Sequence, residues 1–143
     1  MDLRIRRVKK QVALPTRATE GSAGYDLCAA IDSPLCIGGG SVVLVPTGIA
    51  MEIPVGYVGL VFIRSGISSK YGVSLANSVG VIDSDFRGEI MLPLTCVRAD
   101  GYTIKPLERL AQLVVVPFVT PNIVEVDSLT ATARGKGGFG STG

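Results

Sequence analysis

Residues 41–63 read SVVLVPTGIAMEIPVGYVGLVFI, and this stretch decides the fold class. It holds three short apolar runs, 41–45, 49–53 and 57–63, and a proline or glycine separates each run from the next. Further runs of the same kind follow at 89–97 and at 113–119, the last broken by Pro117. Such runs, about ten residues apart with turn residues between them, are typical of an all-β sandwich or barrel.

Helical periodicity is nearly absent, and one short helix is expected at residues 65–71. Ser65 is the expected N-cap, and Gly72 suits the left-handed position after the last helical residue. The segment 80–91 is expected to form a β-hairpin with a tight turn at 84–85.

Composition narrows the class of protein. A chain of 143 residues suits one compact domain. Only 18% of the residues are charged, against a usual ~25%, which favours an oligomer with less free surface. The net charge of +2 is too small to indicate nucleic-acid binding. No apolar run approaches the ~20 residues of a membrane span, so no membrane association is expected.

Cysteine and histidine counts limit the chemistry. Three cysteines without a CxxC pair indicate packed, reduced thiols in a cytoplasm-like compartment. The chain has no histidine, which excludes a Ser-His or Cys-His triad and a zinc site that needs imidazole. An enzyme built from this chain must use carboxylates, arginine, lysine, backbone amides and a borrowed metal.

Two segments have the composition of anion sites. The C-terminal RGKGGFGSTG combines backbone amides, two cations, hydroxyls and one aromatic ring, although a disordered tail is the commoner fate of such a composition. Arg64-Ser65-Gly66 stands where a strand meets a helix, and a helix N-terminus favours anions. An ordinary surface arginine beside an N-cap fits the same three residues.

Two carboxylates stand out from their surroundings. Asp83 follows the apolar residues of GVID and could act as a base for water, although an aspartate there is more often a turn former. Asp26 lies within the apolar segment AGYDL and needs a partner, which is an arginine, a metal-bound water or a backbone amide. A structural salt bridge is the simpler interpretation of Asp26. Gln112 enters another aliphatic strand and suits either an anion or an edge of the backbone.

Taken in order, these segments resemble a known family. AGYDL, RSG, GVIDSDFRG, RLAQL and RGKGGFGSTG are similar in sequence and spacing to the five motifs of the trimeric dUTPases, and the resemblance covers residues 15–143. The resemblance implies a jelly-roll-like β-barrel over residues 1–133 and a closing arm at 134–143. It also implies a homotrimer with shared active sites, located in the cytoplasm or, for a viral protein, in the cytoplasm or nucleus of the host cell.

The implied activity is Mg²⁺-dependent hydrolysis of dUTP to dUMP and pyrophosphate (dUTP diphosphatase), which limits uracil in DNA and supplies dUMP for thymidylate synthesis. Asp83 would activate the attacking water, and Asp26 would act on Mg²⁺ through water. The implied substrate-binding residues are Arg64, Ser65, Gly66, Asn77, Gly80, Val81, Ile82, Asp83, Phe86, Met91, Gln112, Arg134, Phe139, Gly140 and Ser141. Within this set, the arm residues Arg134, Phe139, Gly140 and Ser141 would reach the site of another subunit.

The sequence departs from the family pattern in three places. Ile63 replaces a proline, Phe86 a tyrosine, and Leu107-Glu108 the usual Gly-Asp. Two alternatives remain: a dCTP deaminase-like enzyme, which would release ammonia, and a nucleotide-sensing module without activity. The basic N-terminal segment could contact an acidic partner, but its alternation with Leu3, Ile5 and Val8 favours a solvated edge strand.

Overall fold

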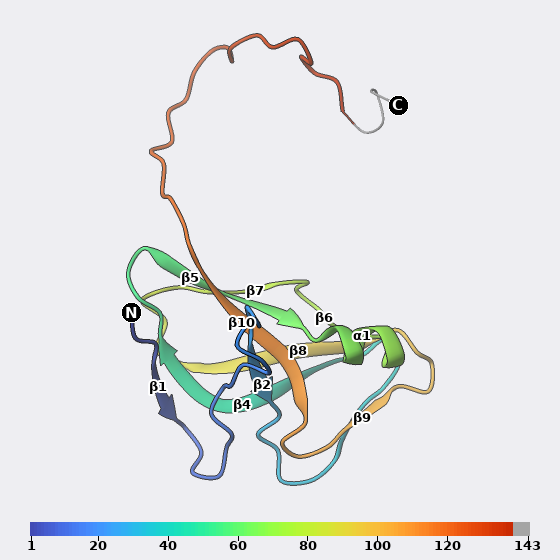
Figure 1. The fold of residues 1–143 in the computed structure, drawn as a ribbon. Coiled ribbons are helices and arrows are strands. Elements are labelled where there is room, and N and C mark those ends of the chain that lie inside the picture. Colours follow the sequence, from blue (N-terminus) through green and yellow to red (C-terminus); the bar gives the residue numbers. More distant parts are fainter. Residues whose placement is uncertain (139–143) are drawn as a thin grey trace.

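The computed structural model describes residues 1–138 and is mostly β (Figure 1). Its elements are β1 (Arg4–Arg7), β2 (Tyr25–Cys28), β3 (Leu35–Ile37), β4 (Val42–Glu52), β5 (Tyr57–Ile63), α1 (Ser65–Tyr71), β6 (Val73–Leu75), β7 (Gly80–Ile82), β8 (Glu89–Cys96), β9 (Tyr102–Ile104) and β10 (Arg109–Pro117). The all-β expectation is therefore confirmed, with α1 as the single helix of the described part.

The strands form two four-stranded antiparallel sheets and one small pair. The sheet orders are β1-β4-β8-β6 and β2-β10-β5-β7, while β3 pairs with β9. The sheets are not hydrogen-bonded into one closed barrel across residues 1–138. The layers nevertheless lie face to face in the manner expected for a jelly-roll-like fold (Figure 1).

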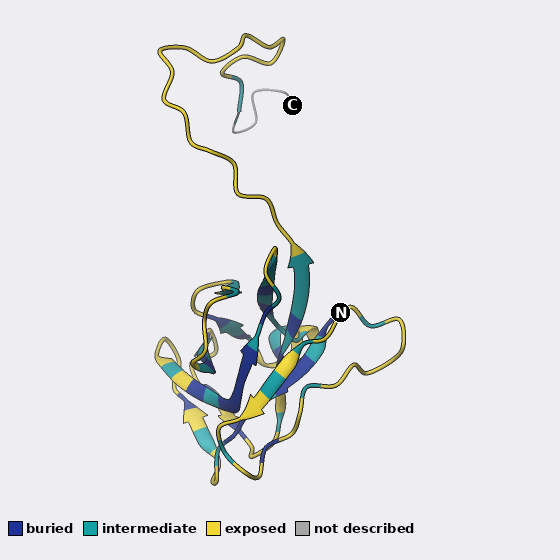
Figure 2. Cartoon of the chain, turned by 90° about the vertical axis from the view of Figure 1, so that its left-hand side faces the viewer, coloured by how far each residue is buried: buried dark blue, intermediate teal, exposed yellow. Residues whose placement is uncertain are grey.

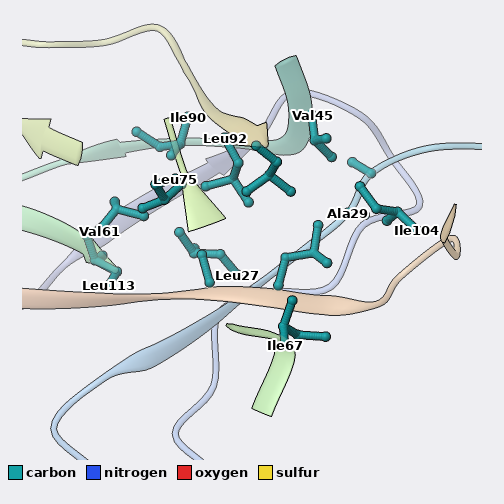
Figure 3. Packing of buried hydrophobic residues seen from close by; sticks show 14 of the residues in the cluster. Leu27, Ala29, Val45, Val61, Ile67, Leu75, Ile90, Leu92, Ile104 and Leu113 are labelled. Atoms are coloured by element: carbon teal, nitrogen blue, oxygen red, sulfur yellow. The ribbon is translucent and has the colours of Figure 1, made fainter. Parts of the chain in front are cut away.

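The core fills the space between the two large sheets. Leu27, Val61 and Leu113 come from one sheet and meet Val45 and Leu92 from the other (Figure 3). Strand β8 alternates between half-buried and buried residues along its length, as expected for a strand with one face on a core. Met91 therefore lies on the face of β8 that points away from this core.

Three local expectations were wrong. The runs 41–45 and 49–53 form one strand, β4, which passes through Pro46 with a register irregularity between Pro46 and Ala50. Ser65 does not cap α1, because Arg64 occupies the N-cap and makes no side-chain capping hydrogen bond. Cys36 is exposed rather than packed, although all three cysteines are free thiols.

The segment 80–91 is a crossover between sheets and not a hairpin. Strand β7 pairs with β5, whereas β8 pairs with β4 and β6. The turn at 83–86 is nevertheless tight, because the amide of Phe86 donates to the carbonyl of Asp83 at 3.2 Å. Strand pairing here is decided by the core that each strand must cover.

Beyond β10, residues 118–138 leave the body of the molecule as an extended, mostly exposed segment (Figures 1 and 2). At the other end, β1 lies at the edge of its sheet with its basic residues exposed, as expected for a solvated edge strand. No helix within residues 1–138 is long and apolar enough to cross a membrane.

Candidate functional site

Asp26 is clamped by two arginines. It lies on β2 and is only 8% exposed. Its Oδ1 forms an ion pair with Arg64 Nε at 3.0 Å, and its Oδ2 accepts a hydrogen bond from Arg109 Nη1 at 3.1 Å. Burial of a carboxylate without such partners is unfavourable, which explains why a charged residue can stand in this apolar strand. We call Asp26, Arg64 and Arg109 the Asp26 cluster. Its two guanidinium groups and one carboxylate carry one net positive charge.

Sequence reasoning assigned no role to Arg109. It begins β10 and is paired in register with Cys28, two residues after Asp26. The position is 83 residues from Asp26 in the chain, so only the strand pairing brings the two side chains together. The neighbouring Cys28 thiol has a raised pKa, chiefly because it is partly buried and next because Asp26 is negative.

The start of α1 adjoins the Asp26 cluster. Arg64 has extended backbone angles, φ −73° and ψ 137°, and its amide donates to the carbonyl of Leu110 at 3.0 Å. The first turn carries no acidic side chain, and the Ser65 and Gly66 side of the helix is exposed. The first amides of a helix have no intrahelical acceptor. They therefore remain available beside a net positive charge.

Gln112 lies on the same face of the sheet as Asp26. The two residues are direct register partners on β10 and β2, and residues directly opposite each other in a strand pair project to one face. Gln112 is half-buried. Together with Arg64, Ser65 and Gly66, it forms what we call the cationic group of the candidate site.

A second set of predicted residues gathers around β7, and we call it the β7 group: Asn77, Gly80, Val81, Ile82, Asp83 and Phe86. Strand β7 is an edge strand, so the backbone groups on its outer side are unpaired within the described part of the chain. Val81 is 61% exposed and Phe86 42% exposed. Asn77 lies just before the strand, and its Nδ2 is 3.9 Å from the position of a Cβ at Gly80.

Sequence reasoning also missed the role of Arg87 in shaping the turn. Arg87 Nη1 donates to the carbonyls of Ser84 at 2.7 Å and Phe86 at 2.9 Å. Its other terminal nitrogen, Nη2, lies 3.7 Å from Glu52 on β4. The only signal in the sequence is an arginine placed directly after a turn, which is too common to assign a role.

The two groups lie apart within one chain. In the register of the sheet, Ile82 on β7 pairs with Gly59 on β5, and Gly59 pairs with Val115 on β10. Asp83, one residue after Ile82, therefore lies four residues along the strands from the position of Gln112. At ~3.3 Å per residue this offset is about 13 Å along the strands, and β7 also stands two strands away from β10. A single chain therefore does not bring Asp83 close to the cationic group.

The remaining predicted residues lie elsewhere. Met91 is half-buried on the outward face of β8. Arg134 lies in the exposed terminal segment, where its Nε donates to the carbonyl of Gly137 at 2.8 Å. Phe139, Gly140 and Ser141 lie outside the described residues.

The departure at 107–108 has its own local structure. Leu107 has a positive φ of 60°, a conformation that glycine adopts more easily. The Glu108 carboxylate accepts the phenol O–H of Tyr102 and, at 2.8 Å, the amide of Lys105. Burial, and next the hydrogen bond to Glu108, raises the pKa of Tyr102 well above its usual range.

Residues 1–138 contain no cluster of three or more histidine, cysteine, aspartate or glutamate side chains that could hold a metal ion. Both oxygens of Asp26 face a guanidinium, but each carboxylate oxygen can accept more than one hydrogen bond. The described residues therefore suit a metal ion that binds together with an anionic ligand. Asp26 would contact such an ion through a water molecule and not directly. Mg²⁺ commonly binds in this way, because it retains several waters and takes phosphate oxygens directly.

Comparisons of the sequence and of the fold with known proteins point to the same family. The family model described as dUTPase matches residues 10–143. The deoxyuridine 5'-triphosphate nucleotidohydrolase of Paraburkholderia phymatum is 45% identical over 144 residues, covering 100% of this chain and 97% of that protein. The protein of the same name from Desulfitobacterium hafniense is 48% identical over 138 residues, covering 96% and 91%.

Among solved structures, the dUTPase of Staphylococcus bacteriophage 80alpha with dUPNHPP matches with a TM-score of 0.87. It is 28% identical, and the match covers 99% of this chain and 98% of that chain. The dUTPase of phage phi11 of S. aureus matches with a TM-score of 0.83 at 25% identity, covering 92% and 100%.

Proposed function

This chain belongs to the dUTPase family, and from that membership we infer that it hydrolyses dUTP to dUMP and pyrophosphate. The observation that carries the inference is a family match that runs through residues 10–143 and so includes all five motifs. The reaction lowers dUTP, which limits uracil in DNA, and it supplies dUMP for thymidylate synthesis.

We propose that the cationic group holds the triphosphate. Arg64 and Gln112 donate to phosphate oxygens, and the Ser65 and Gly66 amides face them from the start of α1. The Asp26 carboxylate keeps the Arg64 side chain in place through its 3.0 Å ion pair. In-line attack at phosphorus depends on positioning and charge neutralisation, which fits a chain without histidine.

The β7 group is proposed to bind the nucleoside. The unpaired outer edge of β7 at Val81 and Ile82 offers amides and carbonyls in the pattern of a pairing partner for uracil. Asn77 lies just before this segment, and Met91 is proposed to contact the nucleoside from β8. The Phe86 ring would lie under the deoxyribose and leave no space for a 2′-hydroxyl. A pocket that hydrogen-bonds one base edge discriminates strongly against others.

Asp83 is the proposed general base. Its carboxylate is exposed at the end of β7 and has no ion-pair partner among residues 1–138, so it can accept a proton from water. Mg²⁺ is the proposed cofactor, and when bound it would neutralise charge on the pyrophosphate leaving group. The protein's part is to hold the phosphates at Arg64 and Gln112 and to place water against Asp83.

The proposed assembly is a homotrimer with shared sites. The offset of about 13 Å along the strands between Asp83 and the row of Gln112 favours a site built from two chains. Exposed apolar residues support the association: Val42 and Leu44 on β4, and Ile123, Val124 and Val126 in the terminal segment, of which Ile123 is 99% exposed. Residues 134–143 are proposed as the arm that closes over a neighbouring site, with 1–133 as the domain that carries it.

Product analysis tests the activity. We expect Mg²⁺-dependent pyrophosphate release from dUTP and little from dCTP, dTTP or UTP. Equal turnover of dTTP or UTP would contradict the proposed selectivity. Ammonia release from dCTP would indicate the deaminase instead, and binding without any product would indicate a sensing module.

The role of Asp83 is tested by Asp83→Asn, with Asp85→Asn in the same exposed turn as the matched control. The first variant should bind nucleotide and lose about 10²–10⁴-fold in kcat, because an amide cannot accept the proton. The control should keep normal turnover. A wild-type kcat in Asp83→Asn would show that the carboxylate is structural.

Subunit mixing tests the shared site. Chains that lack residues 134–143 should be nearly inactive, as should Asp83→Asn chains. Mixed trimers of the two should regain some activity, because intact arms and intact Asp83 side chains can meet at one site. A monomeric mass together with full activity would contradict the trimer, and no rescue despite subunit exchange would contradict the shared arm.

A further inference from the structure

The Gln112 side chain lies directly over Gly24, the residue that precedes β2. A Cβ at Gly24 would stand 2.5 Å from Gln112 Oε1, 3.0 Å from its Cβ and 3.2 Å from its Cδ. Gly24 does not have a positive φ. Glycine is therefore needed here for space and not for backbone conformation, since an L-residue could adopt the same φ.

The Gln112 carboxamide therefore lies close against the backbone at Gly24. The side chain makes no hydrogen bond to another described residue, so its position depends on the shape of the surface beneath it. A Cβ at Gly24 would meet Gln112, and Gln112 is the direct register partner of Asp26, so both project to one face of the sheet. The space at Gly24 thus lies on the face where Asp26 meets Arg64 and Arg109.

We propose that Gly24 is a positioning residue for Gln112. Because Gly24 has no side chain, it leaves space for the Gln112 carboxamide to pack against the chain at the start of β2. The carboxamide then lies beside the Asp26 ion pairs and points toward the phosphates. This inference rests on the proposed phosphate contact of Gln112. It adds a residue that acts through Gln112 and does not itself touch the substrate.

The expected effect of a side chain at position 24 follows from the distances between its Cβ and the Gln112 atoms. With alanine at position 24, Oε1 must move by more than half an ångström to reach ordinary van der Waals contact, and the Cβ of Gln112 is too close to be relieved by a rotamer change alone. A displacement of about 1 Å in a positioning group can cost ~10²-fold in rate. We expect Gly24→Ala to lower kcat/KM by about 10–100-fold.

A double-mutant cycle tests the mechanism. Gly24→Ala, Gln112→Ala and the double variant are compared, with Gly21→Ala as the control because a Cβ there meets nothing within 4 Å. If Gly24 acts through Gln112, adding Gly24→Ala to Gln112→Ala should cost less than about threefold. Independent, multiplying losses would overturn the proposal.

Ligand binding separates positioning from general damage. Gly24→Ala should weaken binding of the non-hydrolysable dUpNHpp while leaving that of deoxyuridine within about twofold, because only the triphosphate reaches Gln112. Equal weakening of both ligands would overturn the inference. If Gln112→Ala itself keeps full kcat/KM, the proposed phosphate contact fails; if Gln112→Ala is impaired and Gly24→Ala is not, the positioning role alone fails.

Discussion

Gly48 is a glycine at which the structure predicts a large loss of stability on substitution. It lies in the irregular stretch of β4, with φ at +69°. Its amide donates to Glu89 Oε1 at 2.7 Å, and its carbonyl accepts the amide of Val8 at 2.8 Å. A Cβ at this position would overlap Val12 Cγ1 and stand 2.9 Å from the Cβ of Ala30.

The expected magnitude has three parts. An L-residue in the left-handed region costs about 1–2 kcal/mol, and overpacking a filled core costs about 1–3 kcal/mol. Alanine also restricts the unfolded chain, which returns about 0.4–1 kcal/mol. Gly48→Ala should therefore lower the free energy of unfolding by about 1–5 kcal/mol.

The measurement is urea unfolding at one fixed protein concentration, because association also contributes to the stability of an oligomer. Gly21→Ala is the control, since a Cβ there meets nothing within 4 Å, and it should stay within about 1 kcal/mol of the wild type. In a Val12→Ala background the overlap is partly removed. The cost of Gly48→Ala should then fall by about 1 kcal/mol.

Two results would refute this reasoning. A loss below 1 kcal/mol would mean that the neighbours of Gly48 yield easily. A strictly additive cycle with Val12→Ala would mean that Val12 is not the obstacle, and that backbone conformation alone accounts for the effect.

Three further predictions concern other parts of the molecule. The pKa of Tyr102 is raised in the folded state, chiefly by burial and next by Glu108. The neutral phenol therefore stabilises the fold fully below the unfolded pKa of about 10, and this stabilisation is lost as the pH rises above that value. Tyr102→Phe should reduce the decrease of the urea midpoint at alkaline pH. A Cβ at Gly88 would stand 2.6 Å from Phe86 Cζ, so Gly88→Ala should displace the ring and reduce the ratio of kcat/KM for dUTP over UTP by about tenfold. Cys36 is the exposed thiol and should react with iodoacetamide before the other two cysteines, as peptide mapping would show; simultaneous labelling of all three would contradict the described packing.

Short-range signals in the sequence were sufficient for much of the fold. Residues 57–63 form β5 and residues 65–71 form α1, with Gly72 in the left-handed conformation at φ 67°, each as expected. These features depend on side chains and backbone angles within a few residues of one another. The order and spacing of the five motifs were also sufficient to identify the family.

The candidate site could be assembled from the sequence only in part. The residue pattern predicted that Asp26 needs a partner, but it could not select Arg64 and Arg109, which are far from it in the chain. The same limit made 80–91 read as a hairpin, because two adjacent strands with a turn between them fit that pattern equally well. The glycines at 24 and 88 gave no sign that their absent side chains make room for Gln112 and Phe86.

By itself, therefore, the sequence determined the β class, the position of α1 and the family, because periodicity, turn residues and motif spacing are properties of neighbouring residues. Only the tertiary structure decided that β7 joins β5 while β8 joins β4 and β6. It alone placed two arginines on one buried carboxylate and set Asp83 apart from Gln112. Those outcomes depend on which apolar faces pack against one another. The arrangement of lowest free energy is set by contacts between residues far apart in the chain, which a local sequence pattern does not contain.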